Sequence, residues 1–322
     1  ELILMFAENQ KILSLSGGVG GAKLVKGLTH CLSPEQLTVV ANTGDDFEHF
    51  GLRICPDLDT LMYTLTGIND NKRGWGLARE TWQCLSAIEQ VSGDTWFKLG
   101  DKDLATHLTR THLLNEGKTL TEVTTELFRK LGGDANILPM SDELVSTIVE
   151  TNIGDLSFQH YFVREHCMPT VTGFRFDGVE LARPQNEFLT LLRGNDLAAT
   201  VICPSNPFVS VDPILTMSGV RESLIQNFAP VVAVSPIVAG KAIKGPAAKM
   251  MQELSMPANA GAVAQYYGDL LDGFVIDESD ASHARFIEAL GIKVLVTPTI
   301  MNTLQDRIDL AQQVLQFSKS LA

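Results

Sequence analysis

The stretch Ser16–Lys23, with the sequence SGGVGGAK, constrains the fold of this chain more than any other feature. It follows a short apolar run containing Ile12, Leu13 and Leu15, and it precedes a segment with the periodicity of an amphipathic helix. Glycines between a strand and a helix allow a tight turn, and the amide groups that open a helix can receive an anion. The pattern therefore predicts a strand, a glycine-rich turn and a helix, a unit typical of α/β folds that bind phosphates or nucleotides.

The glycine-rich turn differs from two known phosphate-binding motifs. A P-loop would have glycine in place of Ala22 and serine or threonine in place of Leu24. A G-x-G-x-x-G pattern counted from Gly18 ends on Lys23. Because the P-loop hydroxyl helps to hold Mg²⁺, a metal would have to be bound elsewhere in this chain. We expect Gly18, Gly20 and Lys23 to contact phosphate, and the alternative is that the glycines only permit close packing.

Carboxylates gather in Asn42–Thr60, directly after the apolar run LTVVA. Asp45 and Asp46 follow the end of this expected strand, and Asp57 and Asp59 open the helix expected behind it. Mg²⁺ prefers carboxylate oxygens with water and substrate phosphates as further ligands, so Asp45 and Asp46 are the expected metal ligands. For Asp57 a helix N-cap is as good an interpretation as a function, and Asp59 would then lie in the first helical turn.

The order of the predicted elements indicates an α/β fold of the Rossmann-like, doubly wound type, with a mainly parallel sheet. We expect residues 1–322 to form a single large α/β domain whose core comprises 11–68 and 196–322. Amphipathic stretches without an obvious strand among them predict a helical insertion at about 70–135. Alternating stretches separated by turn residues, namely VSTIVET, LSFQHYFV and TVTGFRF, predict a β-hairpin insertion at about 144–182. A helix is also expected near 212–227.

Two further stretches follow expected strand ends. CPSNP offers Ser205 and Asn206 as hydrogen-bonding groups, although Ser-Asn-Pro is also common turn chemistry. SPIVAGKAIKGPAAK places Lys241 and Lys244 in an otherwise acidic protein, which suggests a local phosphate clamp, the alternative being a solvated loop. Trp75 in RGWGL could stack on a planar ring, although a lone tryptophan beside a helix start is more often a packing residue.

The charge and the cysteines limit the classes of partner. A formal net charge of −13 leaves no basic excess for binding nucleic acid or an anionic membrane surface. No apolar run approaches the length needed to span a membrane. The 5 cysteines are widely spaced and contain no C-x-x-C pair, which fits a reducing cytoplasm better than a disulfide framework.

Five segments, in this order and at these separations, resemble the 2-phospho-L-lactate transferase family of deazaflavin coenzyme F420 biosynthesis: SGGVGGAKL, NTGDD, PDLDT, SNPFVSVDPIL and SPIVAGKAIKGP. The resemblance covers nearly the whole chain, and RGWGL followed by Glu80-Thr81 adds to it. It implies a Mg²⁺-dependent transfer of a phosphorylated three-carbon acid, phospholactyl or enolpyruvyl phosphate, from a guanosine-diphosphate-linked donor to the ribitol hydroxyl of the deazaflavin Fo, with release of GMP. The resemblance also implies a homodimer.

The resemblance implies roles for the residues already singled out. Asp45 would be the first Mg²⁺ ligand, and Asp46 and Asp59 would contact the metal or the acceptor hydroxyl. The donor phosphates and guanosine would be contacted by Gly18, Gly20, Lys23, Ser205, Asn206, Lys241 and Lys244.

Two other functions are weaker matches. The related gluconeogenesis-factor family, a regulator that binds nucleotide sugars, shares the glycine turn and the later loops but not RGWGL with its helical insertion. An NAD(P)-dependent oxidoreductase fits poorly because the dinucleotide fingerprint fails at its third glycine.

Overall fold

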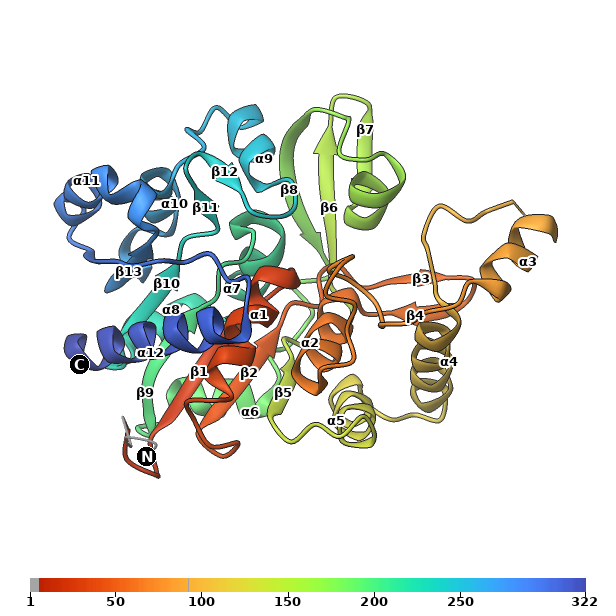
Figure 1. The fold of residues 1–322 in the computed structure, drawn as a ribbon, viewed down its shortest axis with the longest axis horizontal. Coiled ribbons are helices and arrows are strands. Elements are labelled where there is room, and N and C mark those ends of the chain that lie inside the picture. The colour runs from red at the N-terminus through yellow and green to blue at the C-terminus, as the bar shows by residue number, and fades with distance from the viewer. Residues whose placement is uncertain (1–5, 92) are drawn as a thin grey trace.

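The structure, a computed structural model, describes residues 6–91 and 93–322. At its centre is a 7-stranded sheet in the order β14-β13-β10-β9-β1-β2-β5, and all of its pairings are parallel (Figure 1). The sheet grows in opposite directions from β1, so the predicted doubly wound, Rossmann-like α/β fold is confirmed. Its strands are β1 (Lys11–Ser16), β2 (Leu37–Ala41), β5 (Asn136–Pro139), β9 (Leu197–Ile202), β10 (Val231–Val234), β13 (Gly273–Ile276) and β14 (Lys293–Val296).

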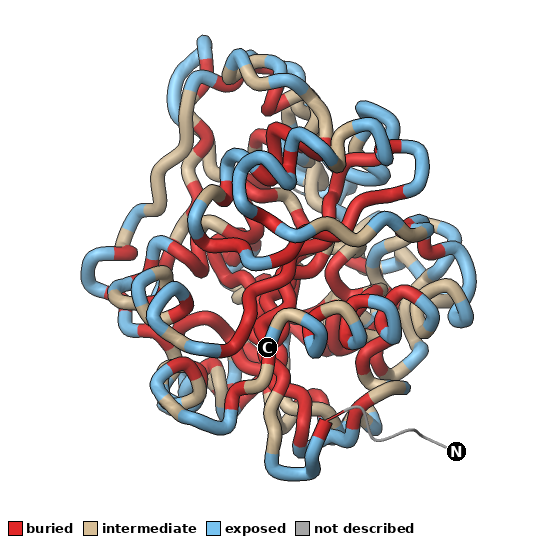
Figure 2. Tube along the Cα trace, turned by 90° about the vertical axis from the view of Figure 1, so that its left-hand side faces the viewer, coloured by how far each residue is buried: buried red, intermediate tan, exposed pale blue. Residues whose placement is uncertain are grey.

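Both faces of this sheet are covered, because successive strand residues point to opposite sides. Leu13 and Leu15 of β1 join one hydrophobic cluster, while Ile12 joins the cluster on the other face. Figure 2 shows the buried segments gathered in the middle of the molecule and exposed segments around them. Helices α1 and α12 contact each other on the Ile12 side of the sheet.

The α-helices occupy the connections between strands, except α12, which follows the last strand. None of the helices within residues 6–91 and 93–322 is long and apolar enough to cross a membrane. Their bounds are α1 (Gly18–Leu28), α2 (Pro56–Thr66), α3 (Gln83–Val91), α4 (Asp101–Asn115), α5 (Leu120–Lys130), α6 (Asn186–Arg193), α7 (Asp212–Leu215), α8 (Val220–Gln226), α9 (Ala247–Glu253), α10 (Ala260–Tyr267), α11 (Ala284–Ala289) and α12 (Leu304–Leu321).

Smaller antiparallel sheets are attached to this core. The β-hairpin insertion forms a 3-stranded sheet in the order β7-β6-β8, from Gly154–Ser157, Ser146–Thr151 and Val171–Asp177. A hairpin of β3 (Phe47–His49) and β4 (Leu52–Ile54) lies within the carboxylate-rich stretch and was not predicted. The strands β11 (Ile237–Val238) and β12 (Lys241–Ala242) form another short hairpin.

The structure corrects several predicted elements. Between the helical and hairpin insertions the chain returns to the central sheet as β5, a strand too short to stand out from its flanks in the sequence. The strand expected at LSFQHYFV ends at Ser157, and a π-helical turn follows at His160–Arg164. The helix expected at 212–227 is broken into α7 and α8 around Gly219, whose φ of +77° favours glycine.

Candidate active site

Strands β1, β2 and β9 end at the same level, and their following loops meet at one edge of the sheet. Ser16 pairs in register with Ala41, and Leu15 pairs with Ile202. In doubly wound sheets, ligands bind outside the carboxyl ends of the strands, where the strand order reverses. The three loops at this edge hold the glycine turn, the stretch after Asn42 and the CPSNP stretch.

Ser205 joins the glycine turn to the loop after β9. Its hydroxyl Oγ lies 3.1 Å from Gly17 N, which donates to it, and donates in turn to Gly17 O at 2.8 Å. The following residue, Gly18, has a φ of +64°, which a residue with a side chain adopts only with strain. Ser205 therefore lies beside the turn and its hydroxyl bonds the turn itself, while its role in binding a ligand stays a prediction.

Asp57 connects the same turn to the end of β2. Its Oδ1 accepts a hydrogen bond from Gly18 N at 2.7 Å, and its Oδ2 accepts one from Asn42 Nδ2 at 2.9 Å. The N-cap of α2 is Cys55, so the interpretation of Asp57 as a helix cap is wrong. The Asp57 carboxylate instead lies at the N-terminus of α1, where the helix dipole favours negative charge.

Three glycines of the turn are required for close packing. A Cβ on Gly17 would lie 2.5 Å from Ser210 Cβ, and one on Gly20 would lie 2.5 Å from the carbonyl oxygen of Pro204. A Cβ on Gly21 would lie 2.4 Å from Ser16 Oγ. The packing explanation therefore holds for these glycines, while at Gly18 the backbone conformation itself requires glycine.

Gly20→Ala should destabilise the protein by about 1 to 3 kcal/mol, because the new methyl group meets a backbone carbonyl that cannot rotate away. The free energy of unfolding from urea denaturation measures this. As a control, Gly194→Ala places its Cβ 3.2 Å from the carbonyl oxygen of Thr190, a milder contact with the same kind of atom, and should destabilise the protein less than Gly20→Ala does. Unchanged stability of Gly20→Ala would contradict the packing explanation.

Asp45 and Asp46 are buried at this edge, and one carboxylate oxygen of each has no hydrogen-bond partner in the described residues. Asp45 is 6% exposed and Asp46 is 3% exposed. The Oδ1 atom of each lacks a hydrogen-bond partner among the residues that the structure describes. Burial, followed by the charge of Asp57, raises the pKa of Asp45 well above its usual range. Burial raises the pKa of Asp46 to about 6, against the opposing effect of Arg53 at 3.3 Å.

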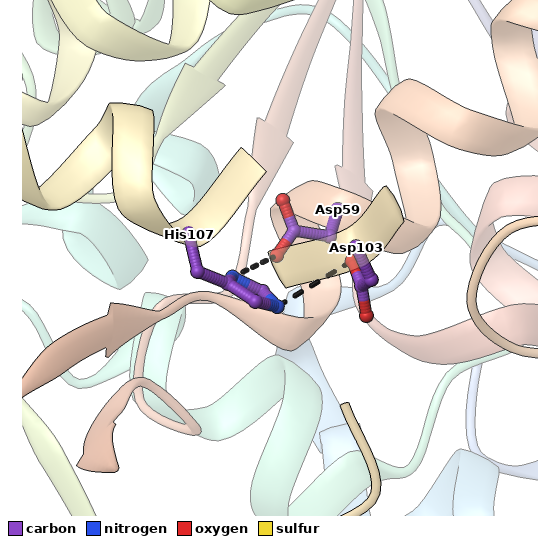
Figure 3. Close-up of side chains that lie close together, drawn as sticks. All are labelled: Asp59, Asp103 and His107. Carbon is purple, nitrogen blue, oxygen red and sulfur yellow. Dashed lines mark ion pairs between the residues drawn. The ribbon is translucent and has the colours of Figure 1, made fainter. Parts of the chain in front are cut away.

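Asp59 belongs to a second buried group that reaches into α4 (Figure 3). Arg110 donates to both oxygens of Asp59. His107 lies between two carboxylates, with Nδ1 3.7 Å from Asp59 Oδ2 and Nε2 3.4 Å from Asp103 Oδ1. Tyr63 donates to the same Asp103 oxygen at 2.7 Å. The predicted site residue Asp59 is therefore the counter-ion of a buried arginine from the helical insertion.

The ligand atoms of this second group are spaced as in a metal site, but the group already contains a positively charged side chain. Ligand atoms of Asp59, Asp103 and His107 lie within 4.8 Å of one another. Arg110 Nη1, however, lies 3.2 Å from His107 Nδ1, and a guanidinium only donates. Nδ1 therefore accepts this bond, so its lone pair is not free to bind a metal. The Arg110 guanidinium already supplies the positive charge that a metal would bring.

The helix α4 also fixes the β3-β4 hairpin beside Asp46. The Arg53 amide donates to Thr111 Oγ1 at 2.8 Å, and the Arg53 carbonyl accepts from Arg110 Nη1 at 3.3 Å. Because both backbone groups of Arg53 are held by α4, its guanidinium is positioned to pair with Asp46. Sequence reasoning missed Arg53, His107 and Arg110, although Asp103, His107 and Arg110 recur at helical spacing on one face of KDLATHLTR.

Basic side chains come together near the glycine turn. Lys23 Nζ donates to the carbonyl of Met301 at 2.8 Å. Burial, and then the neighbouring charges of Arg307 and Lys244, lower the pKa of Lys23. A Cβ on Gly74 would lie 1.7 Å from Lys244 Nζ, so Lys244 reaches the RGWGL loop. The structure thus brings together Lys23 and Lys244, which were predicted from distant segments.

The remaining predicted residues have other surroundings. Asn206 Oδ1 accepts from Phe208 N at 3.0 Å and caps the following turn. Lys241 is an exposed residue of β12. The Trp75 ring is 42% exposed and lies 5.1 Å from the Arg73 guanidinium, which also contacts Trp82. The role predicted for Asn206, Lys241 and Trp75 in binding a ligand therefore stays a prediction.

The sequence is similar to a known family over most of its length. The family described as 2-phospho-L-lactate transferase CofD matches residues 12–297. A phosphoenolpyruvate transferase of Kitasatospora aureofaciens is 37% identical over 318 residues, covering 97% of this chain and 98% of the relative. A 2-phospho-L-lactate transferase of Methanosarcina acetivorans is 39% identical over 303 residues, covering 94% and 97% respectively.

A solved structure supports the fold independently. A member of the UPF0052 family from Bacillus halodurans superimposes with a TM-score of 0.61 at 14% identity, over 95% of this chain and 98% of that chain. Similarity at this level of identity shows a shared architecture.

Proposed function

The chain belongs to the 2-phospho-L-lactate transferase CofD family, and on that basis we propose that it transfers a phosphorylated three-carbon acid to the deazaflavin Fo. The donor would be linked to guanosine diphosphate, the acceptor would be the ribitol hydroxyl, and GMP would be released. The relatives include transferases named for phosphoenolpyruvate and for 2-phospho-L-lactate, which supports an enolpyruvyl phosphate or a phospholactate as the proposed acid.

One observation carries this proposal: two buried carboxylates with unpartnered oxygens, Asp45 and Asp46, lie at the sheet edge where a ligand of this fold binds. Asp46 Oδ2 pairs with Arg53, but the Oδ1 atom of each carboxylate has no partner among the described residues, and buried polar atoms are normally satisfied, so these two oxygens would meet a ligand. Hard oxygen donors of this kind fit Mg²⁺, and Asp45 and Asp46 would hold it. When bound, Mg²⁺ would neutralise charge on the phosphate oxygens.

The residues of the chain then position the reactants. Lys23 and Lys244 would place positive charge beside the donor diphosphate, and the Gly18 turn would approach its oxygens. The acceptor hydroxyl oxygen bonds to the phosphorus that carries the acid, the phosphorus–oxygen bond to GMP breaks, and the hydroxyl proton is lost late. In such a loose transition state, catalysis consists mainly of in-line positioning and charge neutralisation.

We propose further that the protein acts in the cytoplasm as a homodimer. The 5 cysteines are all free, which fits a reducing compartment. The family membership favours the transferase over the nucleotide-sugar-binding regulator, whose named function is not a transfer reaction.

Mg²⁺ should raise the thermal midpoint of the wild-type protein by several degrees, since a ligand that binds only the folded state stabilises it by mass action. Asp45→Asn should abolish most of this shift, while Asp269→Asn, which changes an exposed carboxylate of an ion pair with Arg221, should retain it. Differential scanning fluorimetry with and without Mg²⁺ measures both. An equal shift in Asp45→Asn would remove Asp45 from the metal ligands.

The transfer itself is tested by incubating the protein with Fo, Mg²⁺ and each guanylylated three-carbon acid. Formation of a phosphodiester of Fo together with an equal amount of GMP would establish the reaction and identify the acid. Absence of binding to Fo, together with binding of a UDP-sugar, would instead support the regulator.

A further inference from the structure

Asn42, the residue that follows β2, joins three segments of the chain at the carboxyl edge of the central sheet. Its side chain is fully buried. The Nδ2 atom donates to Asp57 Oδ2 at 2.9 Å and to the carbonyl oxygen of Val209 at 3.2 Å. The Oδ1 atom accepts from Gly44 N at 2.8 Å. The Asn42 amide group therefore bonds the start of α2, the loop after β9 and its own loop at the same time.

Through Asp57, the Asn42 side chain is connected to the glycine turn. The other oxygen of Asp57, Oδ1, accepts from Gly18 N at 2.7 Å. The backbone of Asn42 is attached to the same region, because its N–H group donates to the carbonyl oxygen of Ser16 at 2.9 Å. A continuous set of hydrogen bonds thus runs from Gly44 through Asn42 and Asp57 to Gly18.

Gly44, which directly precedes Asp45, is held on both sides. Its N–H group donates to Asn42, and its carbonyl oxygen accepts at 2.7 Å from the N–H group of Thr147 in the β-hairpin insertion. A Cβ on Gly44 would lie 2.6 Å from Thr147 Oγ1 and 3.1 Å from Pro213 Cβ. Because both backbone groups are bonded and the space around them is filled, the direction in which the chain enters Asp45 is fixed.

We propose that Asn42 is a positioning residue that holds the Asp45 carboxylate in register with the glycine turn, so that a cation on Asp45 faces phosphates at Gly18. This inference rests on the proposed function, since it takes Asp45 as a metal ligand and the turn as the place of the donor phosphates. Hydrogen bonds that orient a ligating side chain tune the affinity of the site for its metal.

Asparagine suits this position because its side chain offers two donors and an acceptor. Aspartate has nearly the same size and could still accept from Gly44, but it could not donate to Asp57 or Val209. It would also place a second buried carboxylate against Asp57, and like charges repel strongly where water is excluded. Asn42→Asp therefore breaks the connection to the glycine turn while the bond to Gly44 stays possible.

Asn227 provides a matched control at the opposite edge of the sheet, before the start of β10. Its Oδ1 atom accepts at 2.9 Å from the amide of Ala229, two residues further on, the same arrangement as at Asn42. Its Nδ2 atom donates to the carbonyl oxygens of Leu192 at 2.8 Å and Gly194 at 3.4 Å. Asn227→Asp thus removes two donated hydrogen bonds of the same kind away from the site.

Calorimetric titration with Mg²⁺ gives the Kd for the metal, and the transfer assay gives kcat. Asn42→Asp should raise the Kd for Mg²⁺ and lower kcat, each by about tenfold to a hundredfold, as is typical when a group that orients a metal ligand is lost. Asn227→Asp should lower the free energy of unfolding in urea but leave the Kd for Mg²⁺ and kcat at the wild-type values. An equal loss of Mg²⁺ affinity in Asn227→Asp would make the effect a general one of stability and overturn the inference.

The double variant Asn42→Asp/Asp57→Asn exchanges the amide and the carboxylate across their contact and keeps the net charge. An amide again donates to a carboxylate between the two positions, so most of the Mg²⁺ affinity lost in Asn42→Asp should return. An exchange that restores none of the affinity would show that this contact does not position Asp45.

Asn42→Ser tests the same connection if Asn42→Asp fails to fold. A serine hydroxyl can still accept from the amide two residues further on, but it is too short to reach Asp57. This variant should therefore fold and still raise the Kd for Mg²⁺ by about tenfold.

The wild-type protein separates this inference from the proposed function. Wild-type Mg²⁺ affinity and kcat in both Asn42→Asp and Asn42→Ser would overturn the inference alone. If the wild type binds Mg²⁺ but forms no phosphodiester of Fo, the proposed function fails and the Mg²⁺ affinities of the variants decide the inference. A wild type that neither binds Mg²⁺ nor turns over would overturn both.

Discussion

Asp45→Asn is expected to lower the kcat of the transfer by about a hundredfold to a thousandfold without destabilising the folded protein, as is typical when one preorganised electrostatic group is removed from a site. The reason is that Asp45 is a buried carboxylate with an unpartnered oxygen, so its charge opposes folding until a cation binds. Asparagine keeps the size and removes the charge. The free energy of unfolding without Mg²⁺ should therefore be equal or higher in the variant.

The pH dependence of the free energy of unfolding tests whether the charge of these buried carboxylates opposes folding. Burial raises the pKa of Asp46 to about 6, and burial also raises that of Asp57 to about 6. An acid whose pKa is raised on folding contributes stability that is present below its unfolded pKa and is lost as the pH rises through the folded value. Without Mg²⁺, these carboxylates should therefore lower the free energy of unfolding between about pH 4 and about pH 7.

Urea denaturation at several pH values, with and without Mg²⁺, measures this dependence. Asp45→Asn should show a smaller loss of stability across the window, because one of the mutually repelling carboxylates is gone. The exposed Asp269→Asn should follow the wild type. A variant that is clearly less stable than the wild type at pH 7 would show that the Asp45 carboxylate is satisfied within the protein.

The fold could be predicted because its signals are local and repeated. Apolar strand segments alternate with helical periodicity, and the glycine turn marks the first crossover. The strand β5 escaped prediction because a four-residue buried run has no period to distinguish it from a loop. The π-helical turn at His160–Arg164 escaped because its sequence, HYFVR, is as apolar and aromatic as a strand.

The residues of the site could be predicted from the sequence only in part, for a different reason. Residues at the strand ends, such as Asp45 and Ser205, could be expected at one edge of the sheet because parallel strands place their following loops together. Arg110 and His107 come from an insertion, and nothing in the strand order says where an insertion docks. The cap interpretation of Asp57 was one of two left open because its position after Pro56 resembles a cap, whereas its partners, Gly18 and Asn42, are distant in sequence.

Arg110→Met is expected to lower the free energy of unfolding by about 3 to 5 kcal/mol, because it leaves the Asp59 carboxylate buried and unpaired. Arg110 is only 1% exposed and donates to both Asp59 oxygens as well as to the Arg53 carbonyl. Its loss should also lower activity, since Arg53 positions Asp46. Denaturation with urea, followed by assay under conditions where the variant stays folded, measures the two effects separately.

The double variant Asp59→Leu/Arg110→Met separates a counter-ion from a catalytic group. Replacing both members of a buried ion pair by apolar side chains is often neutral for stability, so the double variant should regain most of the lost free energy of unfolding. A carboxylate that accepts two hydrogen bonds from an arginine still has lone pairs for a third donor. We therefore expect kcat to stay at least about tenfold below the wild type, because the acceptor hydroxyl would lose the contact with Asp59 that the family resemblance implies. Recovery of kcat together with stability would instead make Asp59 only the counter-ion that holds the helical insertion against the site.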